Sequence, residues 1–557
     1  MNAINLNHNR QTDNMRGSLR LFLRIKENFL TVGGFGLLLA GCLTSCTKDL
    51  NREPSNTNTA NIQYSTPAGY KQVLAKVYGS YSLVSSQGTG VSDVNIAGIT
   101  DPGTTDFVRA WFNVQELMTD EDICAWNDAA LQAFHNMNLV STNVYVTAIY
   151  TRSLFQITVA NEFIRESTDA AIAARHITGA DADNIRHYHA EARFLRAFQY
   201  WVLMDLFGNP AFVTENDPIG DYIPKQIQRA DLFNYIESEL KGVDSNLVAP
   251  RQNEYGRADQ AAAWALLARM YLNAEVYLGA GKGRYNDAIT YASKVLNAGY
   301  SLMPNYRNLF TSDNNLNNPE IILPIAYDAT NSQNFGGTTF LICSAHGTDP
   351  TDNAKFGIPA GGWLGNRSTS PLPSQFGDYS GAGDKRALFG GGTLAINSVL
   401  DFTQGVEVQK YTNQTSTGTT PYSPNGVLVS TDFPLFRLAE MYLVYIEAVT
   451  RGGNDGDAAT ALTYFNLLRT RGYGNASGNV STFTLNDVLN ERQRELYWEN
   501  FRRTDLIRFN QFTGSSYLWP WKGGVQAGAG VDAHLNLLPL PAPEVNSNPN
   551  LKQNPGY

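Results

Sequence analysis

Residues 185–207, IRHYHAEARFLRAFQYWVLMDLF, decide the fold class of this chain. Large apolar side chains, among them Phe194, Phe198 and Trp201, occupy nearly every face of the second half of this stretch. A helix that is apolar on nearly all sides has to be enclosed by other helices. The stretch therefore predicts a large helical body with this segment at its centre.

Helical periodicity recurs along most of the remaining chain. We expect further helices at residues 68–83, 143–165, 230–245, 260–278, 285–298, 437–450, 458–471 and 485–506. Small and aromatic residues alternate in 260–278 and 285–298, which lets two helices pack closely, as in tetratricopeptide repeats. Thr484 and Asp487 have the spacing of a capping box at the start of the last helix. The fold class that we predict is mainly α, on a tetratricopeptide-like helical-repeat scaffold.

Two regions, residues 84–129 and 305–427, lack this periodicity and are rich in Gly, Ser, Thr, Asn and Asp. A structureless loop of more than a hundred residues is unusual in a compact body. We therefore expect loop-rich insertions with short strands, for example at 321–323 and 406–411. Loops on a rigid scaffold usually carry binding function, so these insertions are predicted to form the ligand side of a single body over residues 67–557.

Composition excludes two broad classes of protein. Hydrophobic residues make up 43% of the 557 residues, which is ample for a core and excludes global disorder. The net charge of −9 argues against nucleic acid as a partner, because nucleic-acid binding needs a basic surface.

The N-terminus has the pattern of a secreted lipoprotein. Basic residues from Arg16 to Lys26 precede an apolar run at 29–40, which is too short and too rich in glycine to span a membrane comfortably. Small residues then precede Cys42 and Cys46, so either cysteine has the setting of a lipidation site. The polar residues up to 66 are expected to form a tether.

Only Cys124 and Cys343 remain beyond these two cysteines. Two cysteines in so long a chain do not form a disulfide framework. They fit buried apolar positions better than a bridge, although the sequence leaves their pairing open.

The sequence contains no catalytic pattern that we can identify. Glu491, Glu495 and Glu499 lie four residues apart on one helical face, but arginines share that helix, which favours a structural ion-pair network. His187 and His189 point to different sides of a helix, and the seven His and four Cys show no zinc-type spacing. We therefore expect no enzyme, no metal and no cofactor.

Aromatic residues within the two insertions are the candidates for ligand binding. A sugar ring stacks its C–H face on an aromatic plane, while its hydroxyl groups pair with Asn, Asp, Gln or Arg. The alternative is that each tryptophan only anchors its loop in the body. The candidate residues are Trp363, Asn366, Arg367, Trp126, Asn127, Asp128, Trp111 and Tyr379.

Several segments, taken in order along the chain, resemble the SusD/RagB family of outer-membrane nutrient-binding lipoproteins. They are CTKDLNREP at 46–54, EARFLRAF at 191–198 with LFGNP at 206–210, FPLFRLAEMYL at 433–443, NLLRTR at 466–471, ERQREL at 491–496, RRTDLIR at 502–508, and LPLP at 538–541 with NPNLKQNPGY at 548–557. The resemblance covers nearly all of the chain after the signal peptide. It favours Cys46 over Cys42 as the lipidated residue, with a signal peptide at 1–45 and a tether at 46–66.

The resemblance implies a non-catalytic protein, lipid-anchored and exposed at the cell outer membrane. Such a protein would bind oligosaccharides and deliver them to a SusC-like TonB-dependent transporter, with the helical side toward the transporter and the insertions toward the ligand. Capture of a peptide or another nutrient by the same mechanism is an alternative, and a helical-toroid glycosidase is a further one. The resemblance does not assign individual binding residues, because these lie on variable loops.

Overall fold

The computed structural model describes residues 60–557, and residues 63–557 form one compact unit. The expected signal peptide, Cys42, Cys46 and most of the tether lie outside the described residues. Tyr64, which we placed in the tether, is 2% exposed and packs against Tyr70 with ring centroids 5.0 Å apart. The packed body therefore begins slightly before the predicted position 67.

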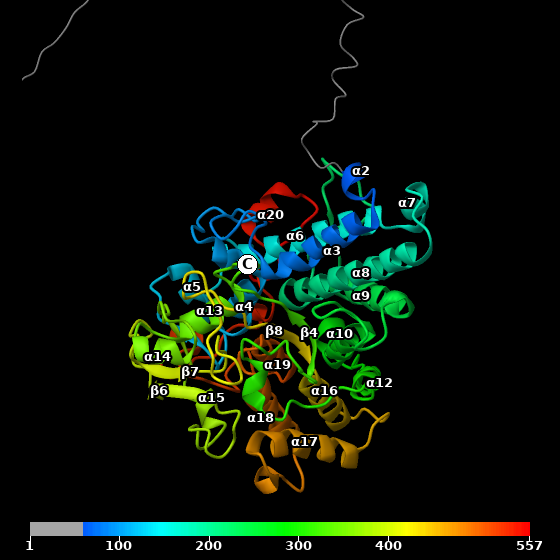
Figure 1. Ribbon diagram of the computed structural model, residues 1–557. Coiled ribbons are helices and arrows are strands. Elements are labelled where there is room, and N and C mark those ends of the chain that lie inside the picture. The colour runs from blue at the N-terminus through cyan, green and yellow to red at the C-terminus, as the bar shows by residue number, and fades with distance from the viewer. Residues whose placement is uncertain (1–59) are drawn as a thin grey trace, which may run out of the picture. The chain divides into compact units, whose positions relative to one another are not determined.

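The long helices pack one after another and confirm the mainly α fold class. They are α3 (Pro67–Ser82), α6 (Val144–Glu166), α8 (Gly179–Phe207), α9 (Arg229–Val243), α10 (Gln260–Leu272), α12 (Tyr285–Leu296), α16 (Leu438–Thr450) and α17 (Ala458–Tyr473). Helix α6 packs on α8, α8 on α9, α10 on α12, α12 on α16, and α16 on α17, as can be followed in Figure 1. Each helix thus buries its apolar face mainly against its neighbours, as helical repeats do.

Helix α8 lies among these helices as its sequence predicted. From Ala190 to Phe207 every residue except Arg193 is buried. Phe198 and Trp201 stack with ring centroids 5.9 Å apart. The helix ends at Gly208, whose φ of 72° favours a residue without a side chain.

Two helices that we predicted as continuous are interrupted. Asn273 separates α10 from α11 (Ala274–Leu278) within the predicted helix 260–278. The predicted helix 485–506 consists of α18 (Leu485–Leu496) and α19 (Arg502–Arg508), and the capping box of Thr484 and Asp487 at its start is confirmed. Between α18 and α19, Trp498 and Asn500 adopt φ values of 59° and 67°, which no α-helix allows. The indole of Trp498 is 1% exposed, so burial of a large side chain accompanies this break.

Short elements connect the long helices. The helical ones are α2 (Ala60–Gln63), η1 (Pro102–Thr105), α4 (Phe107–Gln115), α5 (Ala129–His135), α7 (Asp169–Ala174), η2 (Asp244–Asn246), η3 (Tyr306–Leu309), α13 (Gly337–Ala345), α14 (Pro350–Lys355), α15 (Pro371–Ser374), η4 (Ala476–Gly478), η5 (Lys522–Gly524), η6 (Ala533–Asn536) and α20 (Ala542–Ser547). No helix among residues 60–557 combines the length and apolarity that crossing a lipid bilayer requires.

The strands form four antiparallel pairs. These are β1 (Ile123–Cys124) with β5 (Asn366–Arg367), β2 (Ala211–Phe212) with β3 (Lys225–Gln226), β4 (Ile321–Ile325) with β8 (Phe433–Arg437), and β6 (Phe389–Thr393) with β7 (Gly405–Val408). Strand β4 confirms the prediction at 321–323, and β7 confirms the first three residues of the prediction at 406–411, since it ends at Val408. In Figure 1 the elements α13, α14, α15, β6 and β7 gather on one side of the body, away from α9, α10 and α12.

The region 84–129 is less open than we expected. Asp106 caps α4 by accepting a hydrogen bond from the backbone N–H of Arg109 at 2.9 Å. Every residue of α4 is buried. This part of the predicted insertion therefore belongs to the core, and only the segments around α4 are free to form loops.

A buried network of charges joins the second insertion to the helices. It confirms the structural ion-pair role that we predicted, but its basic partners come mainly from other segments and not from the same helix. The Arg437 guanidinium binds Glu495 at 2.6 Å, Glu499 at 2.7 Å and Glu320 at 2.9 Å. Lys410, two residues beyond β7, binds Glu499 at 2.7 Å. All of these side chains are at most 1% exposed. The network therefore ties α18 and β8 to both ends of the insertion.

The same network includes Arg386, which lies in the middle of the insertion. Its guanidinium binds Glu491 at 2.6 Å and Asp384 at 2.6 Å. Burial alone would raise the pKa of Glu491, but Arg386 and the neighbouring arginines outweigh it and lower that pKa to about 2. Because this pKa lies below its ordinary value of 4.5, the stability that Glu491 contributes is present above pH 4.5 and is lost as the pH falls toward 2.

We predict that Glu495→Gln lowers the free energy of unfolding by roughly 3–5 kcal/mol, because it removes a counter-charge that three buried arginines share. Equilibrium urea denaturation followed by circular dichroism measures this change. Asp183→Asn is the control, because Asp183 is 67% exposed and pairs with Arg186 at the surface. Its effect should be at most about 1 kcal/mol. A loss of similar size in both variants would contradict the structural importance of the network.

Candidate functional site

A short strand pair brings the two insertions together. Ile123 pairs with Arg367 and Cys124 with Asn366, and the backbone N–H of Ala125 donates to Gly365 O at 2.9 Å. Residues 126–128 therefore lie beside residues 363–367, although more than two hundred positions separate them in the sequence. The strand pair thus places the two groups of candidate residues that we identified from composition next to each other.

Trp126 lies directly against the backbone of this strand pair. A Cβ atom on Gly365, whose φ is 127°, would come within 2.5 Å of the indole Nε1, so only glycine allows this contact. Phe340 meets the indole edge-on at 6.2 Å, and the Arg109 guanidinium lies 5.9 Å from its centroid. Trp126 is half-buried, so the ring is held in place while part of it stays exposed.

Trp363 is held in a similar way. Its backbone N–H donates to Cys343 O at 2.5 Å, which ties its loop to α13. Its ring packs against Phe335 with centroids 6.4 Å apart, and both side chains are half-buried. We did not single out Phe335 from the sequence as a site residue, because its glycine-rich setting gave no sign of this packing.

The ion pair between Arg109 and Asp101, which lies beside Trp126, was not predicted from the sequence. Arg109 binds Asp101 at 2.6 Å, and the side chain of Asp101 remains 49% exposed. The guanidinium lies over Phe340 at 4.7 Å, so it is held between an aromatic ring and a carboxylate. Such a pair offers hydrogen-bonding groups beside a half-buried indole. No periodicity links Asp101 to Arg109, because they lie on either side of the turn that starts α4.

Three of the predicted site residues are too buried to offer a binding surface. Trp111 on α4 is 1% exposed and stacks on Phe107 with centroids 5.5 Å apart, so its prediction as a ligand residue is wrong. Asn366 and Arg367 form β5 and are 1% and 3% exposed. Arg367 donates to the backbone oxygens of Gly365, Val399 and Gln404, which makes it a support for the loops.

The remaining candidates differ in position. Asn127 is exposed beside Trp126. Asp128 caps α5 and accepts a hydrogen bond from the Tyr145 hydroxyl at 2.5 Å, so both of its carboxylate oxygens already have structural partners. Tyr379 is half-buried and packs edge-on against Phe389 at 6.3 Å, in a different part of the insertion. The structure does not bring it to the two tryptophans by any contact that we can identify among the described residues.

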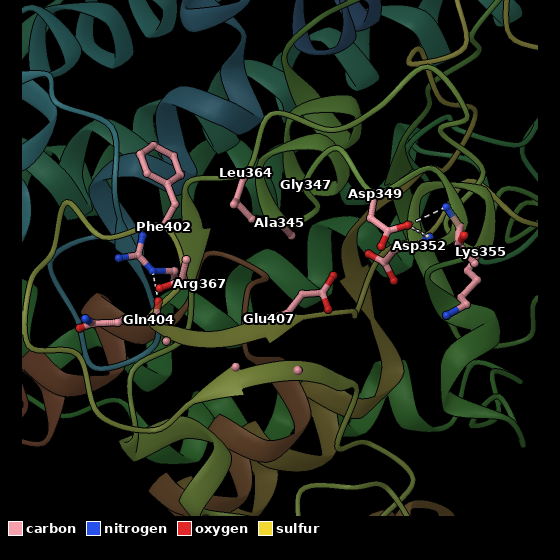
Figure 2. A pocket seen from close by; sticks show the side chains of 15 residues that line it. Ala345, Gly347, Asp349, Asp352, Lys355, Leu364, Arg367, Phe402, Gln404 and Glu407 are labelled. Carbon is pink, nitrogen blue, oxygen red and sulfur yellow. Dashed lines mark hydrogen bonds between the residues drawn. The ribbon is translucent and has the colours of Figure 1, made fainter.

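A hollow of about 430 Å³ lies against β5. Leu364 and Arg367 belong to its wall, so it adjoins the segment that carries Trp363. Figure 2 shows Phe402, Arg367 and Gln404 at one end, and the acidic side chains with Lys355 at the other. The hollow is thus polar and charged, whereas the tryptophans beside it provide apolar ring faces.

A helical-repeat scaffold whose loops carry fixed, half-buried aromatic rings is typical of a binding protein. A model of the SusD family matches residues 298–557, and a model described as "Starch-binding associating with outer membrane" matches residues 95–272. Starch-binding protein SusD of Bacteroides thetaiotaomicron is 34% identical over 565 residues, which cover 93% of this chain and 97% of that protein. The chain belongs to the SusD family, as its motifs indicated.

Solved structures of relatives share the fold. Surface glycan-binding protein A from Bacteroides fluxus has a TM-score of 0.66 at 21% identity, over 88% of this chain and 100% of that chain. Surface glycan-binding protein A from Bacteroides thetaiotaomicron, in complex with laminarihexaose, has a TM-score of 0.65 at 18% identity, over 87% of this chain and 99% of that chain. The names of these relatives describe binding and no reaction, which agrees with our expectation of a non-catalytic protein.

The two cysteines beneath the site are free thiols. Cys124 on β1 and Cys343 on α13 are both buried and unpaired. Burial raises the pKa of Cys124 to about 12, and it raises the pKa of Cys343 as well. The structure therefore settles the pairing that the sequence left open.

We predict that a maleimide labels neither Cys124 nor Cys343 in the native chain, because both are protonated and buried. Both should react after unfolding in urea without any reductant. Peptide mapping by mass spectrometry distinguishes the two positions. Labelling that requires prior reduction would show that a disulfide exists.

Proposed function

We propose that this chain is a lipid-anchored protein, exposed at the outer membrane, that binds oligosaccharides without catalysis and delivers them to a SusC-like TonB-dependent transporter. The observation that carries the binding proposal is the pair of half-buried tryptophans, Trp126 and Trp363, joined by the β1–β5 strand pair. Relatives named for starch and glycan binding support carbohydrate as the ligand class.

The geometry suits a sugar for a physical reason. An indole that is fixed before binding loses little conformational entropy when a ring stacks on it. The exposed part of Asp101, in its ion pair with Arg109, and the exposed side chain of Asn127 offer partners for hydroxyl groups beside Trp126. Trp363 and Phe335 would contact a second position along the same oligosaccharide.

Delivery to a transporter rests on family membership. The description of one matching family model names association with the outer membrane. Helices α6, α8, α9, α10, α12 and α16 pack against one another in this order and form an extended side of the body. We propose that this side contacts the transporter, while the insertions contact the ligand. A lipid anchor at Cys46 would keep this body at the membrane, and Cys42 is the alternative anchor.

We expect Trp363→Ala to weaken oligosaccharide binding at least about fivefold, because it removes a stacking surface and buried apolar area whose loss costs on the order of 1–3 kcal/mol. Trp126→Ala should have an effect of the same kind. Isothermal titration calorimetry against starch-derived and laminarin-derived oligosaccharides measures the affinity and also identifies the preferred glycan.

The matched control is Trp264→Ala. Trp264 is a half-buried tryptophan on α10 that donates to Asp244 at 2.6 Å, so the variant loses an indole from the helical side. It should leave affinity unchanged. If all three variants and the wild type have equal affinities, Trp126 and Trp363 do not belong to the binding site. If the protein binds peptides and no carbohydrate, the ligand class that we propose is wrong.

We expect Cys46→Ser to abolish lipidation, because the thiol at that position is the acceptor for the first acyl chain. Cells grown with labelled palmitate should show incorporation into the wild type and into Cys42→Ser, but not into Cys46→Ser. Membrane fractionation should release Cys46→Ser from the envelope. If Cys46→Ser incorporates palmitate and Cys42→Ser does not, the lipid anchor is at Cys42.

A further inference from the structure

At the acidic end of the hollow beside β5, two carboxylates in its wall and a buried histidine next to them could bind one ion. His346, Asp352 and Glu407 each offer a ligand atom, and these atoms all lie within 4.8 Å of one another. His346 ends α13, Asp352 is on α14 and Glu407 is on β7, so three separate elements contribute. Figure 2 shows Asp352 and Glu407 turned toward the same space.

The imidazole of His346 is fixed in one orientation. Its ring is fully buried and stacks on Phe356, with centroids 3.6 Å apart and an angle of 17° between the planes. Nδ1 faces the carboxylates, at hydrogen-bond contact with Glu407 Oε1 and 3.6 Å from Asp352 Oδ2. Nε2 has no hydrogen-bond partner among residues 60–557. The polar contacts of this ring are therefore all directed at the acidic pair.

The carboxylate of Glu407 is also held in position. The side chain of Gln409 donates to Glu407 Oε2 at 2.9 Å, which leaves Oε1 facing His346. A Cβ atom on Gly390 would come within 2.0 Å of Oε2, so the carboxylate lies directly against the backbone of β6. Glu407 and Asp352 remain 19% and 29% exposed toward the hollow, which gives an ion a route of entry.

We propose that His346, Asp352 and Glu407 form a binding site for one divalent transition-metal ion of the zinc type, with its fourth position open to the hollow. One imidazole nitrogen and two carboxylate oxygens match the ligands of zinc sites with an open position. Tetrahedral bonds of about 2.1 Å place ligand atoms roughly 3.4 Å apart, close to the 3.6 Å between Nδ1 and Asp352 Oδ2. The Glu407 carboxylate would move away from His346 Nδ1, to which it is now hydrogen-bonded, and become the third ligand of the ion.

Calcium fits these three residues less well, because it takes six to eight oxygen ligands and rarely a nitrogen. A proton is the other competitor for the same space. Burial alone would lower the pKa of His346, but Asp352 and Glu407 raise it above its ordinary value, so an imidazolium can bridge the two carboxylates. Lys355 and Asp349 also line the acidic end and partly balance each other in charge.

The test uses the mature chain in detergent micelles, with the purification tag removed and bound metal stripped by EDTA. Isothermal titration with zinc chloride should show one saturable site per chain, and zinc should raise the thermal unfolding midpoint. Asp352→Asn and Glu407→Gln should each weaken zinc binding at least about tenfold, since both remove a ligand. Asp352 is partly exposed, so its variant should still fold even if Glu407→Gln does not.

Asp349→Asn is the matched control. It removes one negative charge from the same hollow, and asparagine still caps α14, where Asp349 accepts from the backbone of Thr351 at 2.8 Å. Zinc binding should be unchanged in this variant. Equal weakening in Asp349→Asn, absence of saturable zinc binding, or tighter binding of calcium than of zinc would each overturn the proposal. Glycan titrations are separate, so a failure of either proposal leaves the other standing.

The site revises our expectation that the chain holds no metal. That expectation rested on spacing along the sequence, which shows only ligands that lie close together in the chain. His346 and Glu407 are 61 residues apart and meet because β7 returns beside the end of α13. No spacing rule for zinc ligands covers such a set.

Discussion

The buried charges around Arg437 and Glu495 hold the second insertion in position, and the binding side of the protein depends on them. Arg386 and Lys410 come from that insertion, while Glu491, Glu495 and Glu499 come from α18 and the turn after it. Buried ion pairs of this kind add little net stability, because desolvation offsets their attraction. Their effect is on geometry, since a displaced insertion would leave several charges buried without partners.

The position of the second insertion, which these buried charges fix, affects both proposed sites. Lys410 follows β7 within two residues, and β7 carries Glu407 and pairs with β6. The β1–β5 pair adds a second connection, which joins the two insertions next to Trp126. The loops are therefore irregular in conformation but fixed in place, and fixed rings and ligands lose less entropy when they bind.

The two proposed sites are neighbours in the fold and offer different chemistry. The tryptophans present apolar ring surfaces, while the hollow presents carboxylates that contact the buried imidazole of His346. Leu364 and Arg367 line the hollow and belong to the same segment as Trp363, so a ligand that occupied one site would lie close to the other. Helices α9, α10 and α12 contribute no residue to either proposed site.

The sequence by itself determined the helices, the capping box at Thr484 and the ion-pair role of Glu491, Glu495 and Glu499. The helices and the capping box depend on residues three or four positions apart, and local periodicity reports such contacts directly. The spacing of the glutamates indicated that they form ion pairs, but most of their basic partners come from other segments. The tertiary structure decided the rest, because it depends on contacts between distant segments. It placed Trp111 in the core and left Trp363 half-buried, although we had named both as candidates for ligand binding. It broke the last long helix after Leu496, and it brought His346 to Glu407, which no local pattern could indicate.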